Sequence, residues 1–315
     1  MPVGSRSVAV CGADGIIGRQ LLAALAADTS LKRVTCIDPI PPDGAPASVR
    51  HRAVDLRSVG GVRALSDLIV EEDFDTLIYL GYLSARLQNQ EDQLTETRVL
   101  IEALSRRPVP RLVYTSSTAV YGVLPGDPSH FEEDAPLALS AESDWVKDKV
   151  ACDQLINRFA LDVDTQVTVL RLAVLIGPNV QNFMTEYLGR PAVPIVQDYD
   201  PPIQLLHETD AVKAYQTAIK RSGMGVYNVV GDGALPLSVA LRVGRRRTTV
   251  LPEIGRTPIT QLLWDKDIVE TAPVMRDLFH YVWVADGGKA GDELGFQPQY
   301  SSKESIEEFY RGSLS

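Results

Sequence analysis

The sequence predicts an α/β fold in which a mostly parallel sheet is covered by helices on both faces. Short β-rich runs alternate with helical patterns through the first half of the chain, as in strand–helix–strand units. Apolar residues make up 45% of the 315 residues and charged residues 23%, a balance that allows a buried core and excludes wholesale disorder. The length indicates one large or two medium domains.

The expected elements follow from apolar runs and from residues that favour helices, such as the Leu and Ala of the first helix. The expected strands span residues 7–11, 33–37, 51–54, 74–80, 111–115, 166–172 and 226–230. The expected helices span residues 16–27, 62–70, 94–106, 144–160, 210–220 and 303–310. Prolines crowd residues 191–202, which we expect to form a loop, and the basic run 242–247 is expected to be a solvated helix end.

Charge and composition exclude several classes of protein. The 31 Lys and Arg against 41 Asp and Glu leave a net charge of −10, which opposes binding to nucleic acid or to an anionic membrane. No apolar run reaches the length of a transmembrane helix, and residues 1–7 do not resemble a signal peptide. The three Cys and four His are scattered, so we expect no metal site, no disulfide framework and a cytoplasmic location.

A glycine-rich turn follows the first strand and opens the first helix. Glycines there permit a tight turn and close approach of the backbone to a pyrophosphate, while the helix N-terminus offers free N–H groups and a positive dipole. The turn predicts a dinucleotide site of the Rossmann type. Its expected cofactor-binding residues are Gly12, Asp14, Gly15, Ile16, Ile17 and Gly18.

Asp38 ends the second strand, about 20 residues after Gly18. A carboxylate at this place accepts hydrogen bonds from ribose hydroxyls and repels a 2′-phosphate. Pro39 and Ile40 follow it in place of an arginine. The sequence therefore favours NAD over NADP as the cofactor.

The spacing of the glycines resembles that of the short-chain dehydrogenase/reductase superfamily, and further motifs resemble its extended branch, the NAD-dependent epimerase/dehydratase family. The most specific match is the run TSSTAVYG at residues 115–122. Other matching segments are residues 54–56, 80–82, 170–178, 207–210, 225–228 and 293–298. The resemblance covers the chain from Val8 to about Tyr310.

The resemblance implies a cofactor domain over residues 1–175, with returning segments near 204–231, and an interleaved, smaller substrate domain over residues 176–315. It implies small-molecule substrates, typically nucleotide-linked sugars, and a homodimer formed through the helices near 94–106 and 144–160. It also implies further cofactor-lining positions, namely Asp55, Leu56, Leu80, Gly81 and Tyr82.

In that family a Tyr acts as acid/base, a Lys holds the nicotinamide ribose and a Ser or Thr hydrogen-bonds the reacting oxygen. Ser117 and Lys149 match the serine and the lysine, but Trp145 stands at the tyrosine position. An indole N–H only donates hydrogen bonds, so Trp145 cannot exchange a proton near neutral pH. Trp145 is expected to pack a ligand pocket or the sheet, and Lys149 to hold the ribose.

Other positions also depart from the family pattern. Gln93 and Val174 replace Asn residues, and residues 201–203 stand where an Arg commonly binds the diphosphate. Tyr82, His130 and His207 are alternative sources of a proton, although His207 is expected to cap or pack locally.

Two functions remain open on these observations. The first is an NAD-dependent epimerase/dehydratase-like oxidoreductase acting on a hydroxyl- or keto-bearing substrate, such as a nucleotide sugar. The second is a catalytically silent NAD-binding sensor or scaffold, suggested by Trp145.

Overall fold

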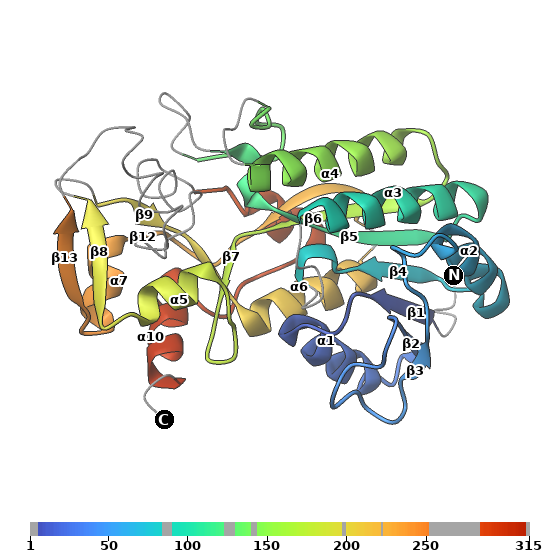
Figure 1. Ribbon diagram of the computed structural model, residues 1–315, viewed down its shortest axis with the longest axis horizontal. Helices are drawn as coiled ribbons and strands as arrows, with labels where there is room; N and C mark the ends of the chain where they lie inside the picture. The colour runs from blue at the N-terminus through green and yellow to red at the C-terminus, as the bar shows by residue number, and fades with distance from the viewer. Residues whose placement is uncertain are drawn as a thin grey trace.

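The computed structural model describes residues 6–83, 90–122, 130–139, 144–196, 200–221, 223–251 and 284–312. Its centre is a seven-stranded sheet in the order β11-β6-β5-β4-β1-β2-β3, with every neighbouring pair parallel (Figure 1). The strands are β1 Arg6–Cys11, β2 Leu31–Ile37, β3 Arg50–Arg52, β4 Thr76–Tyr79, β5 Arg111–Ser117, β6 Gln166–Leu172 and β11 Gly225–Val229. The order reverses between β1 and β4, and ligands bind outside the carboxyl ends of strands at such a switch point.

Alternating side chains of these strands build two apolar layers, one on each face of the sheet. Val8 and Val10 of β1 belong to one buried cluster, whereas Ala9 and Cys11 belong to the other. Successive side chains of a strand point to opposite faces, so a continuous apolar run is buried on both sides. The short apolar runs in the sequence therefore correspond to strands that are buried on both faces of the sheet.

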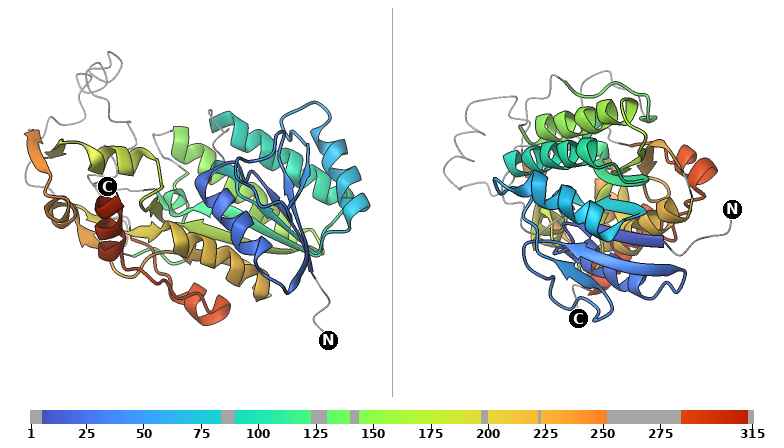
Figure 2. Two further views of the ribbon diagram at one scale, coloured as in Figure 1. Left: turned by 90° about the horizontal axis from the view of Figure 1, so that it is seen from below. Right: turned by 90° about the vertical axis from the view of Figure 1, so that its right-hand side faces the viewer.

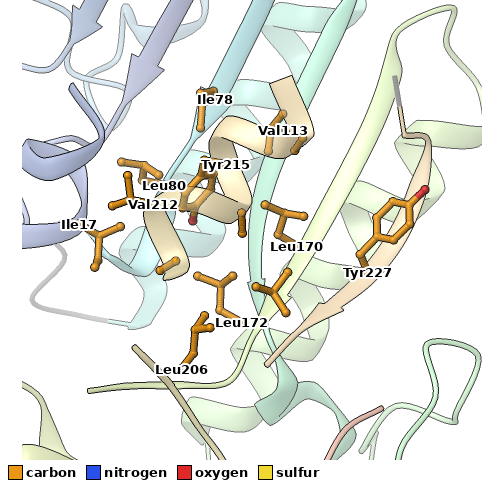
Figure 3. Packing of buried hydrophobic residues seen from close by; sticks show 14 of the residues in the cluster. Ile17, Ile78, Leu80, Val113, Leu170, Leu172, Leu206, Val212, Tyr215 and Tyr227 are labelled. Carbon is orange, nitrogen blue, oxygen red and sulfur yellow. The ribbon is translucent and has the colours of Figure 1, made fainter. Parts of the chain in front are cut away.

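Helices cover both layers. The first layer holds α1 Ile16–Ala26 and α6 Glu208–Lys220, whose Ile17, Val212 and Tyr215 meet strand residues in Figure 3. The second layer holds α2 Gly61–Glu72, α3 Gln90–Arg106 and α4 Asp144–Leu161, with α3 and α4 side by side (Figures 1 and 2). Both faces are thus covered, which makes the fold doubly wound, as predicted.

A smaller unit with its own apolar cluster lies beside the carboxyl ends of the sheet (Figure 1). Its helices are α5 Phe183–Gly189, α7 Leu237–Val243 and α10 Ser302–Gly312. Its strand pairs are β7 Val174–Ile176 with β10 Leu205–His207, β8 Ala192–Val196 with β13 Arg247–Leu251, and β9 Pro202–Ile203 with β12 Leu235–Pro236. Three single turns complete the described elements: η1 Gly81–Leu83, η2 Thr118–Tyr121 and the π-helical η3 Ala290–Leu294.

The expectation of a loop over residues 191–202 is wrong for residues 192–196 and 202, and residues 197–199 lie outside the described part of the chain. Residues 192–196 form β8, and Pro202 begins β9. Pro194 lies within β8, which pairs with the single strand β13 in the described part of the chain. A strand with one ladder partner tolerates a proline, because half of its N–H groups are not needed in the ladder.

Several expected boundaries also differ. The fourth strand is shorter than residues 74–80, the fifth extends to Ser117, and the third begins at Arg50 and ends at Arg52. The basic run 242–247 spans the end of α7 and the start of β13. Among the helices that the structure describes, we find none with the length and apolar character needed to cross a bilayer.

Candidate functional site

The residues predicted to bind the cofactor gather at the carboxyl ends of parallel strands. The glycine turn follows β1, Asp38 follows β2, and Leu80 follows β4. The Leu80 N–H donates to the Cys11 carbonyl oxygen at 3.0 Å, which joins the ends of β1 and β4 at the switch point. The fold thus brings segments far apart in sequence to one edge of the sheet.

The glycine turn needs glycine at two of its positions. Gly12 has a φ of 79°, in the left-handed region that favours glycine. A Cβ on Gly18 would lie 2.4 Å from the Ala13 Cα, so only a hydrogen atom fits between the turn and α1. Gly15, the residue before α1, has no side chain to cap the helix. The first-turn N–H groups, from Ile16 to Gly18, can therefore bind phosphate oxygens.

Asp38 is 4% exposed and joins the end of β2 to the glycine turn. Its Oδ2 accepts a hydrogen bond from the Ala13 N–H at 2.9 Å and another from Cys36 Sγ at 3.1 Å. Asp14 is also buried, and its carbonyl oxygen accepts from Arg19 Nη1 at 2.7 Å. Asp38 is therefore fixed beside the segment that it is predicted to serve.

The predicted adenine side of the site contains Asp55 and Leu56. Leu56 is buried, whereas the Asp55 carboxylate is 41% exposed and accepts from the Arg57 N–H at 2.9 Å. The Arg57 guanidinium extends to α3, where it lies 3.0 Å from Asp92 and 3.8 Å from Glu96. This bridge from the segment after β3 to α3 was not predicted from the sequence.

Glu96 is a second residue that sequence reasoning missed. Burial raises its pKa to about 7, and the Tyr79 hydroxyl, which donates to it at 2.9 Å, works against that rise. Asp38 and Asp55 raise its pKa further by charge repulsion. A carboxyl group that titrates near neutral pH therefore lies close to the predicted cofactor residues.

Ser117 is the last residue of β5 and is 6% exposed. Its hydroxyl accepts from the Ala119 N–H at 3.2 Å and thereby caps η2. The preceding Ser116 donates to Asp153 Oδ2 at 2.6 Å. Ser117 thus has a structural role as a turn serine, and its hydroxyl hydrogen can still be donated to a ligand.

A buried polar network fixes this strand end. Arg171 of β6 contacts Asp153 of α4 at 2.7 and 3.0 Å and donates to the Tyr121 hydroxyl at 2.9 Å. Tyr121 in turn donates to Asn228 of β11 at 2.6 Å. The charged Arg171 inside an apolar strand was the available signal for this network, because a buried charge requires a partner.

Trp145, Lys149 and Tyr82 lie close together. Lys149, 5% exposed, has its Nζ 3.8 Å from the centre of the Tyr82 ring and 5.6 Å from that of the Trp145 ring. Its Nζ also donates to Gln93 Oε1 of α3. Trp145 meets Phe183 of α5 edge-on, with ring centres 6.4 Å apart, so it packs between the sheet domain and the smaller unit. Burial lowers the pKa of Lys149 to about 7.

Other residues considered as proton sources lie in different settings. His207 begins α6 as its N-cap, accepts from the Thr209 N–H and stacks on Tyr300 with ring centres 4.0 Å apart. The expectation that His207 caps locally is therefore confirmed. The His130 side chain is exposed. Val174 is a residue of β7, and Ile203 pairs with β12.

The residues present fit a dinucleotide. The turn from Gly12 to Gly18 would collide with any added Cβ at Gly18, Gly81 has a φ of 51°, and Asp38 is held at the turn by its backbone contact. These features keep backbone amides and a carboxylate together at the carboxyl ends of β1 and β2. Such an arrangement suits a pyrophosphate and a ribose with a free 2′-hydroxyl.

Comparison with known proteins identifies a family and several relatives of this chain. The model of the NAD dependent epimerase/dehydratase family matches residues 8–230. An uncharacterized protein of Mycobacterium tuberculosis is 30% identical over 313 residues, which cover 97% of this chain and 83% of the relative.

Two solved structures share the fold at low identity. A dTDP-glucose 4,6-dehydratase from Bacillus anthracis in complex with NAD has a TM-score of 0.75 at 15% identity, over 98% of this chain and 97% of that one. A UDP-glucuronic acid 4-epimerase from Bacillus cereus in complex with NAD has a TM-score of 0.71 at 18% identity, over 97% and 98%. With the family match over most of its length, the chain belongs to the NAD-dependent epimerase/dehydratase family.

Proposed function

We propose that this protein binds NAD and exchanges a hydride with a hydroxyl- or keto-bearing carbon of a small molecule, with a nucleotide sugar as the substrate class. The observation that carries the proposal is that the glycine turn, Asp38 and Ser117 lie at the carboxyl ends of the parallel strands β1, β2 and β5. Lys149 of α4 contacts Tyr82, which bonds the end of β5. The NAD complexes and nucleotide-sugar names of the two solved structures support the cofactor and the substrate class.

In this proposal the chain holds NAD from the turn to Lys149. The N–H groups at the start of α1 bind the pyrophosphate, Asp38 accepts from the adenosine ribose, and Asp55 with Leu56 lines the adenine. Leu80, Gly81 and Tyr82 line the middle of the cofactor, and Lys149 binds the nicotinamide ribose. Bound NAD would supply the hydride chemistry at the carbon that carries the reacting oxygen.

Ser117 would hold the reacting oxygen by donating its hydroxyl hydrogen. The cap that Ser117 forms on η2 fixes its side-chain rotamer, since the Ala119 N–H occupies one lone pair of its oxygen. The buried ion pair of Asp153 with Arg171 fixes the adjoining Ser116. The Ser117 hydroxyl is thereby preorganised, which limits the reorganisation needed when charge develops on the substrate.

The proposal also includes the division of the chain into domains and its assembly into a dimer. We assign cofactor binding to residues 1–175 with the returning segments near 204–231, and substrate binding mainly to residues 176–315. We also propose a homodimer formed through α3 and α4. Their outer surface carries a hollow of about 570 Å³, and Leu161 at the end of α4 is 85% exposed.

A catalytically silent NAD sensor or scaffold is the second candidate, and Trp145 favours it. The indole at this position packs against Phe183 and provides no group that titrates near neutral pH. In this case NAD occupancy would change the binding of a partner, and no substrate would be turned over.

The test is a turnover assay with NAD and NADH on dTDP-glucose, UDP-glucuronic acid and their 4-keto derivatives, with products separated by chromatography. We expect turnover that Ser117→Ala lowers about 10²-fold, because an oriented donor to the reacting oxygen is lost. Ser238→Ala, an exposed serine on α7, is the control and should retain activity. NAD binding measured by calorimetry without turnover of any panel substrate would contradict the enzyme and favour the sensor.

A further inference from the structure

Tyr82 lies on η1, directly after β4, where the family is expected to line the cofactor. Gly81 has a φ of 51°, and a Cβ there would meet the Tyr79 ring at 2.9 Å and Gln93 Nε2 at 3.2 Å. The backbone at residue 81 favours glycine, and the turn brings the side chain of Tyr82 to the end of β5.

The Tyr82 phenol reaches the end of β5. Its hydroxyl donates to the Ser116 carbonyl oxygen at 3.3 Å, one residue before Ser117. Ser117 is the residue that would hold the reacting oxygen. A phenol held at the backbone beside Ser117 can approach the same substrate oxygen as the serine hydroxyl, which is the arrangement that proton exchange requires.

Lys149 lies against the face of the same ring. Its Nζ is 3.8 Å from the ring centre, within the range of a cation–π contact. Gln93 of α3 holds this Nζ from the other side, and Asp148 and Cys152 of α4 are the titratable groups that act on its charge. Trp145 is farther away, at 5.6 Å, and has no proton to exchange.

We propose that Tyr82 is the acid/base of this chain: its phenol exchanges a proton with the substrate oxygen held by Ser117, and Lys149 supplies the positive charge beside it. The site then contains a serine, a tyrosine and a lysine, as the family pattern does. The tyrosine comes from the turn after β4, whereas the family pattern places it on the helix that corresponds to α4. This inference rests on the proposed function, since it needs a reacting oxygen at Ser117.

The proton balance is as follows. As a keto carbon receives a hydride from NADH, the O–H bond of Tyr82 breaks and an O–H bond forms on the substrate oxygen, which leaves an alcohol and a tyrosinate. The Lys149 ammonium over the ring stabilises the tyrosinate, and a proton from the solvent then restores the phenol. The oxidation of an alcohol by NAD uses the same transfers in reverse.

The charges of the free protein fit the reductive direction. Burial raises the pKa of Tyr82, and the Ser117 hydrogen bond opposes that rise, so the phenol carries its proton at neutral pH. Burial lowers the pKa of Lys149 to about 7, so its ammonium form is lost as the pH rises through that value. We therefore expect the rate of keto reduction to fall as the pH rises above about 7.

The first test is Tyr82→Phe, which keeps the ring over Lys149 and removes only the hydroxyl. We expect kcat to fall about 10²–10⁴-fold while the NAD dissociation constant measured by calorimetry stays unchanged. Tyr310→Phe, whose ring contacts Arg246 in the smaller unit, is the matched control and should retain kcat. Full kcat in Tyr82→Phe overturns the assignment, whereas a wild type without turnover overturns the proposed function and this inference together.

The second test needs no cofactor and no substrate. 3-Fluorotyrosine at position 82 is followed by ¹⁹F NMR across pH in the NAD-free protein. We expect a shift with a midpoint near pH 7, as the Lys149 charge disappears from the ring, and its loss in Lys149→Met. Fluorotyrosine at position 310 faces an arginine, which stays charged, and should show no such midpoint. No midpoint at position 82, or one that survives Lys149→Met, overturns the pairing.

Discussion

The carboxyl group of Glu96 has an unusually high pKa and lies beside the predicted cofactor residues. The group accepts from the Tyr79 hydroxyl and lies 3.8 Å from Arg57, yet burial keeps its pKa near 7. Between pH 4.5 and 7 the folded protein therefore retains a proton that the unfolded chain has lost. Stability falls as the pH rises through this window, because the folded state binds more protons there.

Glu96→Gln should remove this pH dependence. The amide oxygen still accepts from Tyr79 but carries no charge, so the variant should gain stability relative to the wild type as the pH rises. The gain should be absent near pH 4.5 and reach at most about 3 kcal/mol above pH 7. Urea unfolding across pH measures it, with exposed Glu102→Gln on α3 as the control. A gain that is constant across pH would contradict the assignment.

The proximity of single residues could be predicted where the backbone requires a particular residue type. The glycine turn and Asp38 carry a signal within a short stretch of sequence, and the structure brings them together. The contact of Tyr82 with Ser116 could not be predicted, since residues 82 and 116 meet only through the pairing of β4 with β5. Glu96 was missed because nothing in a helix sequence reports how deeply one carboxyl group is buried.

The glycine turn and α1 act as one element. Gly18 allows the first turn of α1 to pack on the Ala13 backbone, and the same geometry places the helix N–H groups at the edge of the sheet where the strands end. Packing and phosphate binding thus depend on the same missing side chain.

Gly18→Ala should therefore damage both properties. The new Cβ would lie 2.4 Å from backbone, which cannot move as a side chain does. We expect a loss of about 1–3 kcal/mol in the free energy of unfolding, together with weaker NAD binding. Denaturant unfolding and calorimetry with NAD measure the two effects. Gly60→Ala precedes α2 in open space and is the matched control. Unchanged NAD affinity in Gly18→Ala would show that the turn does not hold the cofactor.

Elements with long, regular patterns were the predictable ones. The strands of the sheet and helices such as α1 and α6 carry several buried residues in a fixed period. The pairs β9–β12 and β7–β10 have two or three residues per strand, so no period can be read from them. β8 could not be predicted because Pro194 lies within it and Pro191 precedes it, although a strand with one ladder partner tolerates a proline.

At the scale of the whole molecule, α3 and α4 carry apolar side chains that no other described element covers. These helices cover one face of the sheet, but Leu161 is exposed and Leu155 lines the outer hollow together with Leu94. Exposed apolar side chains around a hollow mark a surface for association.

The double variant Leu155→Glu/Leu161→Glu should therefore convert the proposed dimer to a monomer, because it places charges in the apolar contact. Sedimentation velocity measures the mass of the assembly. Val59→Glu changes an even more exposed apolar residue, which does not line the hollow, and should leave the dimer intact. A wild type that sediments as a monomer, or a double variant that still dimerises, would contradict the α3–α4 interface.

The position of β11 in the sheet has a consequence for fragments of this protein. The chain leaves the sheet after β6, builds part of the smaller unit, and returns to place β11 beside β6. A fragment that stops after β8 would leave β6 as a bare edge, with its peptide groups open to pairing with other chains. Cutting the chain between the sheet and the smaller unit would thus produce an aggregation-prone fragment. A chimera with a relative should therefore keep β6 and β11 from the same parent.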